Sequence, residues 1–261
     1  MAEKSAEISL PLEIVILFLD ELRKDRAINS LATCSLVCKV WLDLIRPHLF
    51  AHLHLSQARL DTLIHEYPGL FDSPYSTITT AVQSLKIIVP TSTELRKAIP
   101  LLKSLTNVQR LHFGSNSAFF HATRNFPTKP LANTFPKLVS LELGFDFPDF
   151  KQMADLVCSF PALEVLHLRS HWEGPVTFEE IDRLPPSLTT LKISESTSHV
   201  LRWFNSFRDI HPIRELDVEV NGLIEDILTL NRTLILQALS LRRLIWRYNF
   251  VTPHRPSDGN Y

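Results

Sequence analysis

The chain has 261 residues, of which 45% are hydrophobic, and its 27 Lys and Arg residues nearly balance its 28 Asp and Glu residues. This composition is typical of a globular protein with one large domain or two small ones. The formal net charge of -1 supplies no excess of positive charge for phosphate backbones or anionic lipid. Nucleic acid and membrane surfaces are therefore not expected partners.

The longest apolar run, Ile14 to Leu19, has six residues, whereas a membrane-spanning helix needs about 20. Acidic residues on both sides of this run do not fit a secretory signal, so we expect a cytoplasmic or nuclear protein. In such a reducing compartment Cys34, Cys38 and Cys158 are expected to remain thiols and to act as small buried hydrophobes.

Apolar spacing between residues 10 and 50 predicts two or three short helices. Ile14, Leu17, Phe18 and Leu22 recur at the three-to-four spacing of one helix face, and Pro47 is expected to end or kink a later helix. The apolar surface of these helices is too large to be buried within about 40 residues. Another surface is therefore expected to cover part of it.

After residue 50 a short pattern recurs, in which an apolar residue is followed by Leu three positions later and by a second apolar residue two positions after that. The central leucines are Leu53, Leu85, Leu111, Leu141, Leu166, Leu191, Leu216 and Leu244. Prolines 136, 161 and 186 each precede a central leucine by five residues, at intervals of 25 residues. This constant phase indicates a repeat array.

A unit of this length with one L-x-x-L-x-L strand resembles the leucine-rich repeat. The resemblance implies an α/β solenoid with a parallel sheet on its concave side and helices on its convex side. Ladder positions of the repeat fall on Asn116 and Asn221, with Asp146, His171 and Ser196 in the units between. Helical periodicity is expected at 92–104, 148–158, 178–184, 197–209 and 223–239, with Pro100 interrupting the first of these and an irregular loop at 121–134.

Residues 10–50 resemble an F-box. The matching residues are Leu10-Pro11-x-Glu13-Ile14, Phe18, Leu22, Ser35-Leu36-Val37-Cys38-Lys39-x-Trp41 and Leu49-Phe50, while the link between Leu22 and Trp41 is longer than in compact members. An F-box followed directly by degenerate repeats is similar to the large F-box families of mushroom-forming fungi. The predicted fold is thus a three-helix F-box at 10–50 and a solenoid at 51–250, between a disordered segment at 1–9 and a flexible tail at 251–261.

The resemblance implies a function without catalysis: recognition of a substrate for an SCF-type cullin-RING ubiquitin ligase. In such receptors the F-box binds the Skp adaptor and the repeats hold a target protein. The residues implied to face the adaptor are Leu10, Pro11, Ile14, Phe18, Leu22, Leu36, Val37 and Trp41. The alternative is a leucine-rich-repeat scaffold or inhibitor without a ligase, in which the F-box-like segment only caps the first repeat.

Outward residues of the predicted sheet suggest where a target segment could bind. The candidate patch consists of His167, Arg169, Lys192, Glu215, Asp217, Glu219, Arg243 and Arg247. Opposite charges are expected side by side for Lys192 and Asp217, Glu215 and Arg243, and Glu219 and Arg247. A solvated charge ladder that only keeps the sheet soluble is the other interpretation.

No metal site, cofactor or catalytic group is expected. His52 with His54, and Cys34 with Cys38, have ligand-like spacing but lack further ligands at a recognisable interval. Cys158 with His167 or His171 lacks an orienting group, so core packing is the expected role of this thiol. Trp172, Trp203 and Trp246 are expected in the convex or capping core.

Overall fold

The computed structural model describes residues 11–25, 27–71, 76, 78–88, 92–114, 126–172, 176, 184–207, 212–220 and 224–248. Within these residues the chain is an α/β protein with ten helices and one eight-stranded, all-parallel sheet. The predicted disordered segment at 1–9 and tail at 251–261 lie outside them, as do Leu10, Asn116, Asn221 and most of the expected helix at 178–184.

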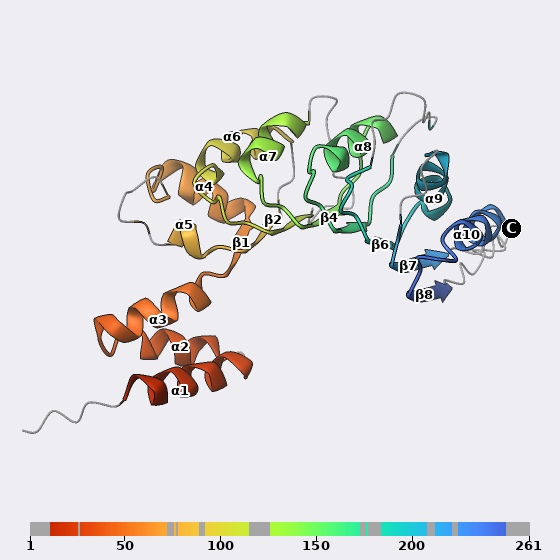
Figure 1. The fold of residues 1–261 in the computed structure, drawn as a ribbon. Helices are drawn as coiled ribbons and strands as arrows, with labels where there is room; N and C mark the ends of the chain where they lie inside the picture. Colours follow the sequence, from red (N-terminus) through yellow and green to blue (C-terminus); the bar gives the residue numbers. More distant parts are fainter. Residues whose placement is uncertain are drawn as a thin grey trace, which may run out of the picture.

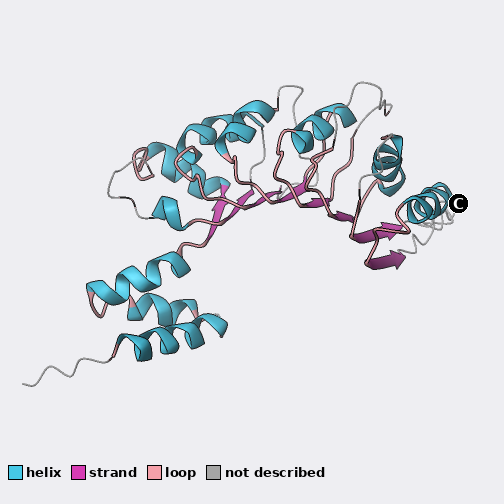
Figure 2. Ribbon diagram, viewed as in Figure 1, coloured by secondary structure: helices cyan, strands magenta, loops and turns pink. Residues whose placement is uncertain are grey.

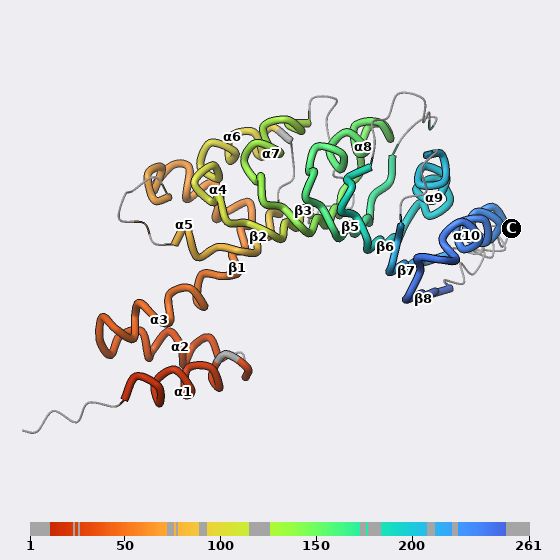
Figure 3. Tube along the Cα trace, in the orientation of Figure 1, coloured from red at the N-terminus to blue at the C-terminus, as the bar shows by residue number. Residues whose placement is uncertain are grey.

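Three helices precede the sheet: α1 (Leu12–Lys24), α2 (Ile28–Cys34) and α3 (Lys39–Leu49). They pack on one another around a small core of their own, formed by Val15, Leu19, Leu31 and Ile45. Figures 1 and 3 show this bundle beside the β1 end of the sheet, where α3 contacts α5. The prediction of short helices between residues 10 and 50 is therefore confirmed, and their identity as an F-box stays a prediction.

Eight strands follow in chain order, and each pairs in parallel with the next. They are β1 (His52–Ser56), β2 (Ser84–Ile88), β3 (Arg110–Gly114), β4 (Ser140–Gly144), β5 (Val165–Leu168), β6 (Thr190–Ile193), β7 (Glu215–Val220) and β8 (Arg243–Tyr248). The register places the eight central leucines opposite one another across all seven strand pairs. The predicted phase of the repeat is therefore confirmed.

Apart from α5, which contacts α3, the remaining helices lie on the opposite side of the sheet from the three-helix bundle (Figures 1 and 2). They are α4 (Gln57–His65), α5 (Ile78–Ala81), α6 (Ser92–Leu102), α7 (Thr128–Thr134), α8 (Phe150–Cys158), α9 (Thr197–Ser206) and α10 (Ile224–Leu236). The sheet forms a shallow arch with these helices on its outer side. This arrangement matches the expected curved solenoid with strands inside and helices outside.

The structure corrects three expectations about the helices. The segment expected to be an irregular loop contains α7, because Pro130 is its third residue, where an amide proton has no partner within the helix. Pro100 does not interrupt α6, which continues for two residues beyond it. Pro47, expected to end or kink its helix, does not end α3, which continues to Leu49. Both prolines lie in the last turn, so each removes one hydrogen bond without dividing the helix.

The regularly spaced prolines have a local role in starting the strands. The amides of Leu138, Leu163 and Leu188 donate to the carbonyl oxygens three residues earlier, at 3.2, 3.2 and 3.1 Å. Each of these turns has proline at its second position, namely Pro136, Pro161 and Pro186. Proline favours that position because its ring fixes φ near the value that the turn requires. The turn directs the following strand into the sheet at the same phase in each repeat.

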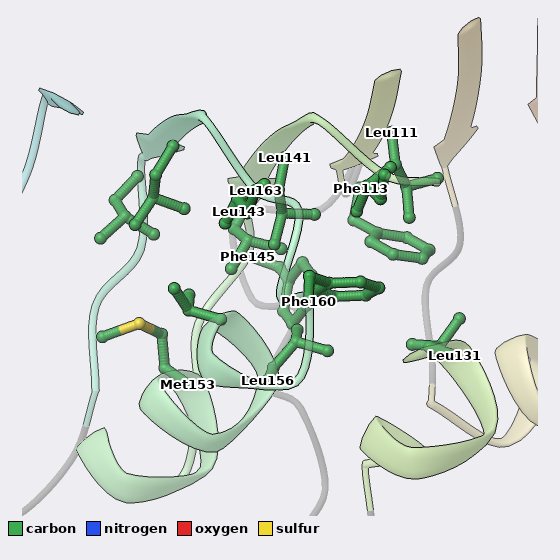
Figure 4. Close-up of a cluster of buried hydrophobic side chains, with 14 of the residues drawn as sticks. Leu111, Phe113, Leu131, Leu141, Leu143, Phe145, Met153, Leu156, Phe160 and Leu163 are labelled. Carbon is green, nitrogen blue, oxygen red and sulfur yellow. The ribbon is translucent and has the colours of Figure 1, made fainter. Parts of the chain in front are cut away.

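The core of the solenoid lies between the strands and the outer helices. Figure 4 shows Leu141 and Leu143 of β4 and Phe113 of β3 on one side, with Met153 and Leu156 of α8 facing them. All five side chains are buried. Stacking one repeat on the next covers these residues from both sides, so the interior is continuous along the array.

The last strand departs from this pattern. Leu244 and Trp246 of β8 occupy inward positions of the repeat, yet they are 41% and 54% exposed, because no strand beyond β8 is present among the described residues. The expectation of a core position is therefore wrong for Trp246. It is confirmed for Trp203, which is fully buried, and Trp172 packs partly buried against the core.

We predict that Leu141→Ala destabilises the fold by about 2–5 kcal/mol, since it removes fully buried methyl groups from a closely packed interior. Ser140→Ala, at the adjacent outward position, is the matched control and should change stability by no more than about 0.5 kcal/mol. Urea denaturation followed by circular dichroism measures both. Equal effects of the two substitutions would contradict the assignment of Leu141 to the inward face and of Ser140 to the outward face of β4.

Candidate functional site

The inner face of the sheet carries three columns of outward side chains that run across the strands. The middle column contains Lys86, His112, Glu142, His167, Lys192 and Asp217, in the order expected from the repeat. None of the six side chains is buried, whereas the leucines next to them in sequence are. The sheet therefore presents a polar surface on the side away from the helices.

Glu142 of β4 lies at the centre of a polar cluster on this surface. Its Oε2 lies 2.8 Å from Nδ1 of His112 on β3, and its Oε1 lies 3.4 Å from Nδ1 of His167 on β5. Nε of Arg169 donates to Nε2 of His167 at 3.3 Å. Because Nε2 of His167 accepts this bond, the ring is neutral and carries its proton on Nδ1, which faces Glu142.

Burial and hydrogen bonding set the protonation states in this cluster. The hydrogen bond from His112 lowers the pKa of Glu142, and this effect outweighs the opposing effect of partial burial. Burial lowers the pKa of His167; the negative charge of Glu142 opposes this shift, and the positive charges of Arg169 and Lys192 add to it. Near neutral pH the cluster therefore contains an ionised Glu142 and a neutral His167.

Six of the eight residues of the sequence patch fall into two groups. His167 and Arg169 belong to the Glu142 cluster, with Nε of Arg169 4.0 Å from Oε1 of Glu142. Further along the sheet, a hollow of about 60 Å³ is lined by Lys192, Glu215, Leu216, Asp217, Arg243, Thr190 and Ile245. These side chains come from β6, β7 and β8. The sequence pattern thus located the surface but did not separate its two parts.

One expected charge pair forms with a different partner. Glu219 and Arg247 are neighbours in register, as predicted, but Nη2 of Arg247 donates to Oδ2 of Asp217 at 2.8 Å. The long guanidinium side chain reaches the diagonal position on the adjacent strand. Lys192 and Asp217, and Glu215 and Arg243, are adjacent in register as expected.

The ladder positions of three successive repeats are joined by hydrogen bonds at the end of the strands. The amide of His171 donates to Oδ1 of Asp146 at 3.0 Å, and Nδ1 of His171 lies 3.2 Å from Oγ of Ser196. Nε2 of His171 also lies 2.8 Å from Oε2 of Glu195. Side chains other than asparagine therefore connect these three repeats at the end of the strands.

The three-helix bundle presents a second candidate surface, which is apolar. Of the residues implied to face an adaptor, Pro11, Ile14, Phe18, Leu36 and Val37 are exposed. The side chains of Leu22 and Trp41 are half-buried against the bundle core, and the rings of Phe18 and Trp41 lie 6.2 Å apart. None of the seven packs against the solenoid core.

The sequence analysis missed several members of this apolar surface. Leu12, Leu17, Ile28 and Val40 are also between 49% and 65% exposed. They belong to α1, whose apolar residues extend beyond the side that faces the bundle core, or to the first turns of α2 and α3. Apolar residues at consecutive positions of α1 were the available signal, because a single face cannot accommodate them all.

The remaining predictions concern isolated residues. Cys34 and Cys158 are partly buried and pack against the two cores, but Cys38, the extended N-cap residue of α3, is exposed. This corrects the expectation that all three thiols are buried. In the described part of the chain, no three His, Cys, Asp or Glu side chains could jointly hold a metal ion.

None of the helices in the described ranges is both long and apolar enough to cross a membrane. No protein-family model matches the sequence, and no curated protein is significantly similar to it.

We predict that Gly114→Ala disturbs the Glu142 cluster. A Cβ at residue 114 would stand 2.9 Å from Nε2 of His112, so the imidazole must move away and its bond to Glu142 is weakened. We expect a loss of about 1 kcal/mol relative to Gly144→Ala, whose Cβ would meet nothing closer than 3.5 Å. Urea denaturation compares the two, and a Gly114→Ala protein as stable as the Gly144→Ala protein would exclude this contact.

His167 should also make stability depend on pH. Its pKa in the folded state is lowered from 6.5, so the unfolded chain binds more protons as the pH falls through 6.5, and the folded state loses stability. His167→Gln should lose less stability than the parent between about pH 7.5 and pH 5.5. Glu142 contributes in the same direction only below its ordinary value of 4.5, outside this window.

The exposed His52 on β1, changed to Gln, is the control for this measurement. Urea midpoints at the two pH values give the change in stability. Identical losses in the parent and the His167→Gln protein would contradict the assignment of a depressed pKa to this partly buried ring.

Proposed function

We propose that the protein is a non-catalytic substrate receptor of an SCF-type cullin-RING ubiquitin ligase. In this proposal α1–α3 form an F-box that binds a Skp-type adaptor, and through it the cullin-RING ligase. Strands β1–β8 with their helices form a leucine-rich-repeat solenoid that binds a target protein. The proposal combines the resemblance of residues 10–50 to the F-box with the exposed apolar surface of the bundle.

The observation that carries the proposal is this apolar surface. Leu36 and Val37 are 85% and 64% exposed, and Ile14, Leu17 and Phe18 of α1 are exposed as well. Large contiguous apolar surfaces on soluble proteins usually mark contacts with other proteins. Apolar side chains on a helix are normally covered by another surface, and polar side chains face the solvent. The bundle core covers only one side of α1, at Val15 and Leu19.

The arrangement of the bundle disfavours the role of a simple cap. A cap would place its apolar side chains on the first repeat, as terminal repeats of solenoids require. The bundle instead has a separate core, and its exposed apolar residues are not part of the solenoid core. Coverage by another protein accounts for them better than coverage by the solenoid.

The inner face of the sheet supports a role in binding a target. It is wide, polar and open, and it carries the Glu142 cluster and the charged hollow on β6–β8. A single chain that binds the adaptor at one end and a target along the sheet would hold the target near the ligase. This tethering raises the effective concentration of the target at the ligase. In this proposal no other mechanism is needed, and no catalytic residue is required.

We predict that Leu36→Ala/Val37→Ala weakens binding to a purified fungal Skp-type adaptor by at least about tenfold, since anchoring apolar side chains dominate such interfaces. Both side chains are exposed, so their truncation leaves the bundle core intact. Isothermal titration calorimetry with the full chain measures the affinity, and circular dichroism confirms that the variant is folded.

The control is Ile235→Ala/Leu239→Ala, which removes equally exposed apolar side chains at the opposite end of the solenoid. It should bind the adaptor like the parent. A parent protein that is folded and monomeric beside excess adaptor would refute the receptor proposal and would favour the scaffold or inhibitor. Equal weakening by both double substitutions would show that the contact does not involve α1–α3 specifically.

A further inference from the structure

Charge is unevenly distributed over the inner face of the sheet. Outward positions of β2, β3 and β6, and the residue that directly follows β5, carry four cations that we call the basic face: Lys86, Arg110, Lys192 and Arg169. Glu142 is the only carboxylate within strands β2–β6. The next strand, β7, carries three acidic residues: Glu215, Asp217 and Glu219.

The carboxylates beside the basic face do not neutralise it. Glu142 is already held by the histidines on both sides of it, at 2.8 and 3.4 Å. Asp217 adjoins Lys192 in register, but its Oδ2 accepts a hydrogen bond from Arg247 of β8. Within the described ranges, the cations of the basic face other than Arg169 form no ion pair. Their charge is therefore available to a bound molecule.

Two histidines of the inner face respond to this positive charge. Burial lowers the pKa of His54, and the charge of Lys86 on the neighbouring strand adds to the effect. Burial also lowers the pKa of His167; the carboxylate next to it opposes this shift, and Arg169 and Lys192 add to it. The cations thus act across neighbouring strands, and the potential over β2–β6 favours an anion.

The outward residues between these cations have mostly small side chains, namely Ser84, Gly114, Ser140, Gly144 and Thr190. Gly114 and Gly144 are neighbours in register, so the sheet has bare backbone at that point. Glycine allows another backbone to approach closely. The long cationic side chains therefore stand beside a low floor, which suits an extended chain.

We propose that the basic face binds an extended segment of the target protein that is rich in aspartate or glutamate. Lys86 and Lys192 lie on strands four steps apart, or about 19 Å at about 4.8 Å for each step. At about 3.3 Å for each extended residue, about six residues cover this distance. Carboxylates form charge-assisted hydrogen bonds with lysine and arginine, and the carboxylates of β7 repel an acidic segment placed further along the sheet.

This inference rests on the proposed function, because it names the chemistry of the target. The probe is an acetylated and amidated octapeptide of alternating glutamate and serine, which places its carboxylates on one side when extended. Fluorescence anisotropy with the full chain, in about 20 mM salt, should show saturable binding at least about tenfold tighter than that of the matched glutamine–serine peptide. The matched lysine–serine peptide should not bind. Raising the salt to about 200 mM should weaken binding of the acidic peptide several-fold.

Two pairs of substitutions test the location. Lys86→Gln/Lys192→Gln removes two charges from the basic face and should weaken binding of the acidic peptide at least about fivefold. Lys97→Gln/Lys129→Gln removes the same charge from exposed positions of α6 and α7 on the outer side, and should bind like the parent. Circular dichroism confirms that both variants are folded.

Any of three results would overturn the proposal. The first is no saturable binding of the acidic peptide to the parent. The second is equal weakening by the two pairs of substitutions, which would mean that only the net charge matters. The third is tighter binding of octathymidylate than of the acidic peptide, which would assign the face to nucleic acid. The titration contains no adaptor, so its failure is distinct from a failure of adaptor binding.

Discussion

The register that stacks one leucine on the next is the constraint on which the rest of the structure depends. Side chains alternate along a strand, so a slip of one residue in any pair would move an inward leucine to the polar face. From Leu85 to Leu216 the central leucines are buried without exception, which makes every such slip costly. The same alternation places Glu142 between two histidines, because the residue after each central leucine must face outward on neighbouring strands.

The two ends of the array show what happens where a neighbouring repeat is missing on one side. An internal repeat is covered by two neighbours, whereas the first and last strands of the sheet each pair with one. At the β8 end this leaves Leu244 and Trp246 exposed, and at the β1 end it leaves a cavity beside Leu53. Both features follow from one cause, because each of these two strands has a neighbouring strand on one side only.

The sequence predicts the periodic part of the fold better than the rest. Pro136, Pro161 and Pro186 recur at one constant spacing, so each proline supports the same phase of the repeat. This phase was sufficient to predict which residues of neighbouring strands lie opposite one another. Helix α7 was missed because Pro130 suggests a loop unless its place in the first turn is known. The Glu142 cluster was missed although its neighbours are histidines, because an imidazole is not counted as a charge. The ion pair of Arg247 depends on side-chain reach, which register alone does not specify.

The bundle and the solenoid bury their apolar side chains in different ways. Each internal repeat buries its leucines against adjacent repeats, so the array covers its own apolar side chains except at its two ends. The bundle has only Val15, Leu19, Leu31 and Ile45 as its core, too few to cover the opposite side of α1. Within a chain this small, no further element is available to do so among the described residues. In the receptor proposal, an adaptor that covers α1 would therefore stabilise the bundle as well as bind it.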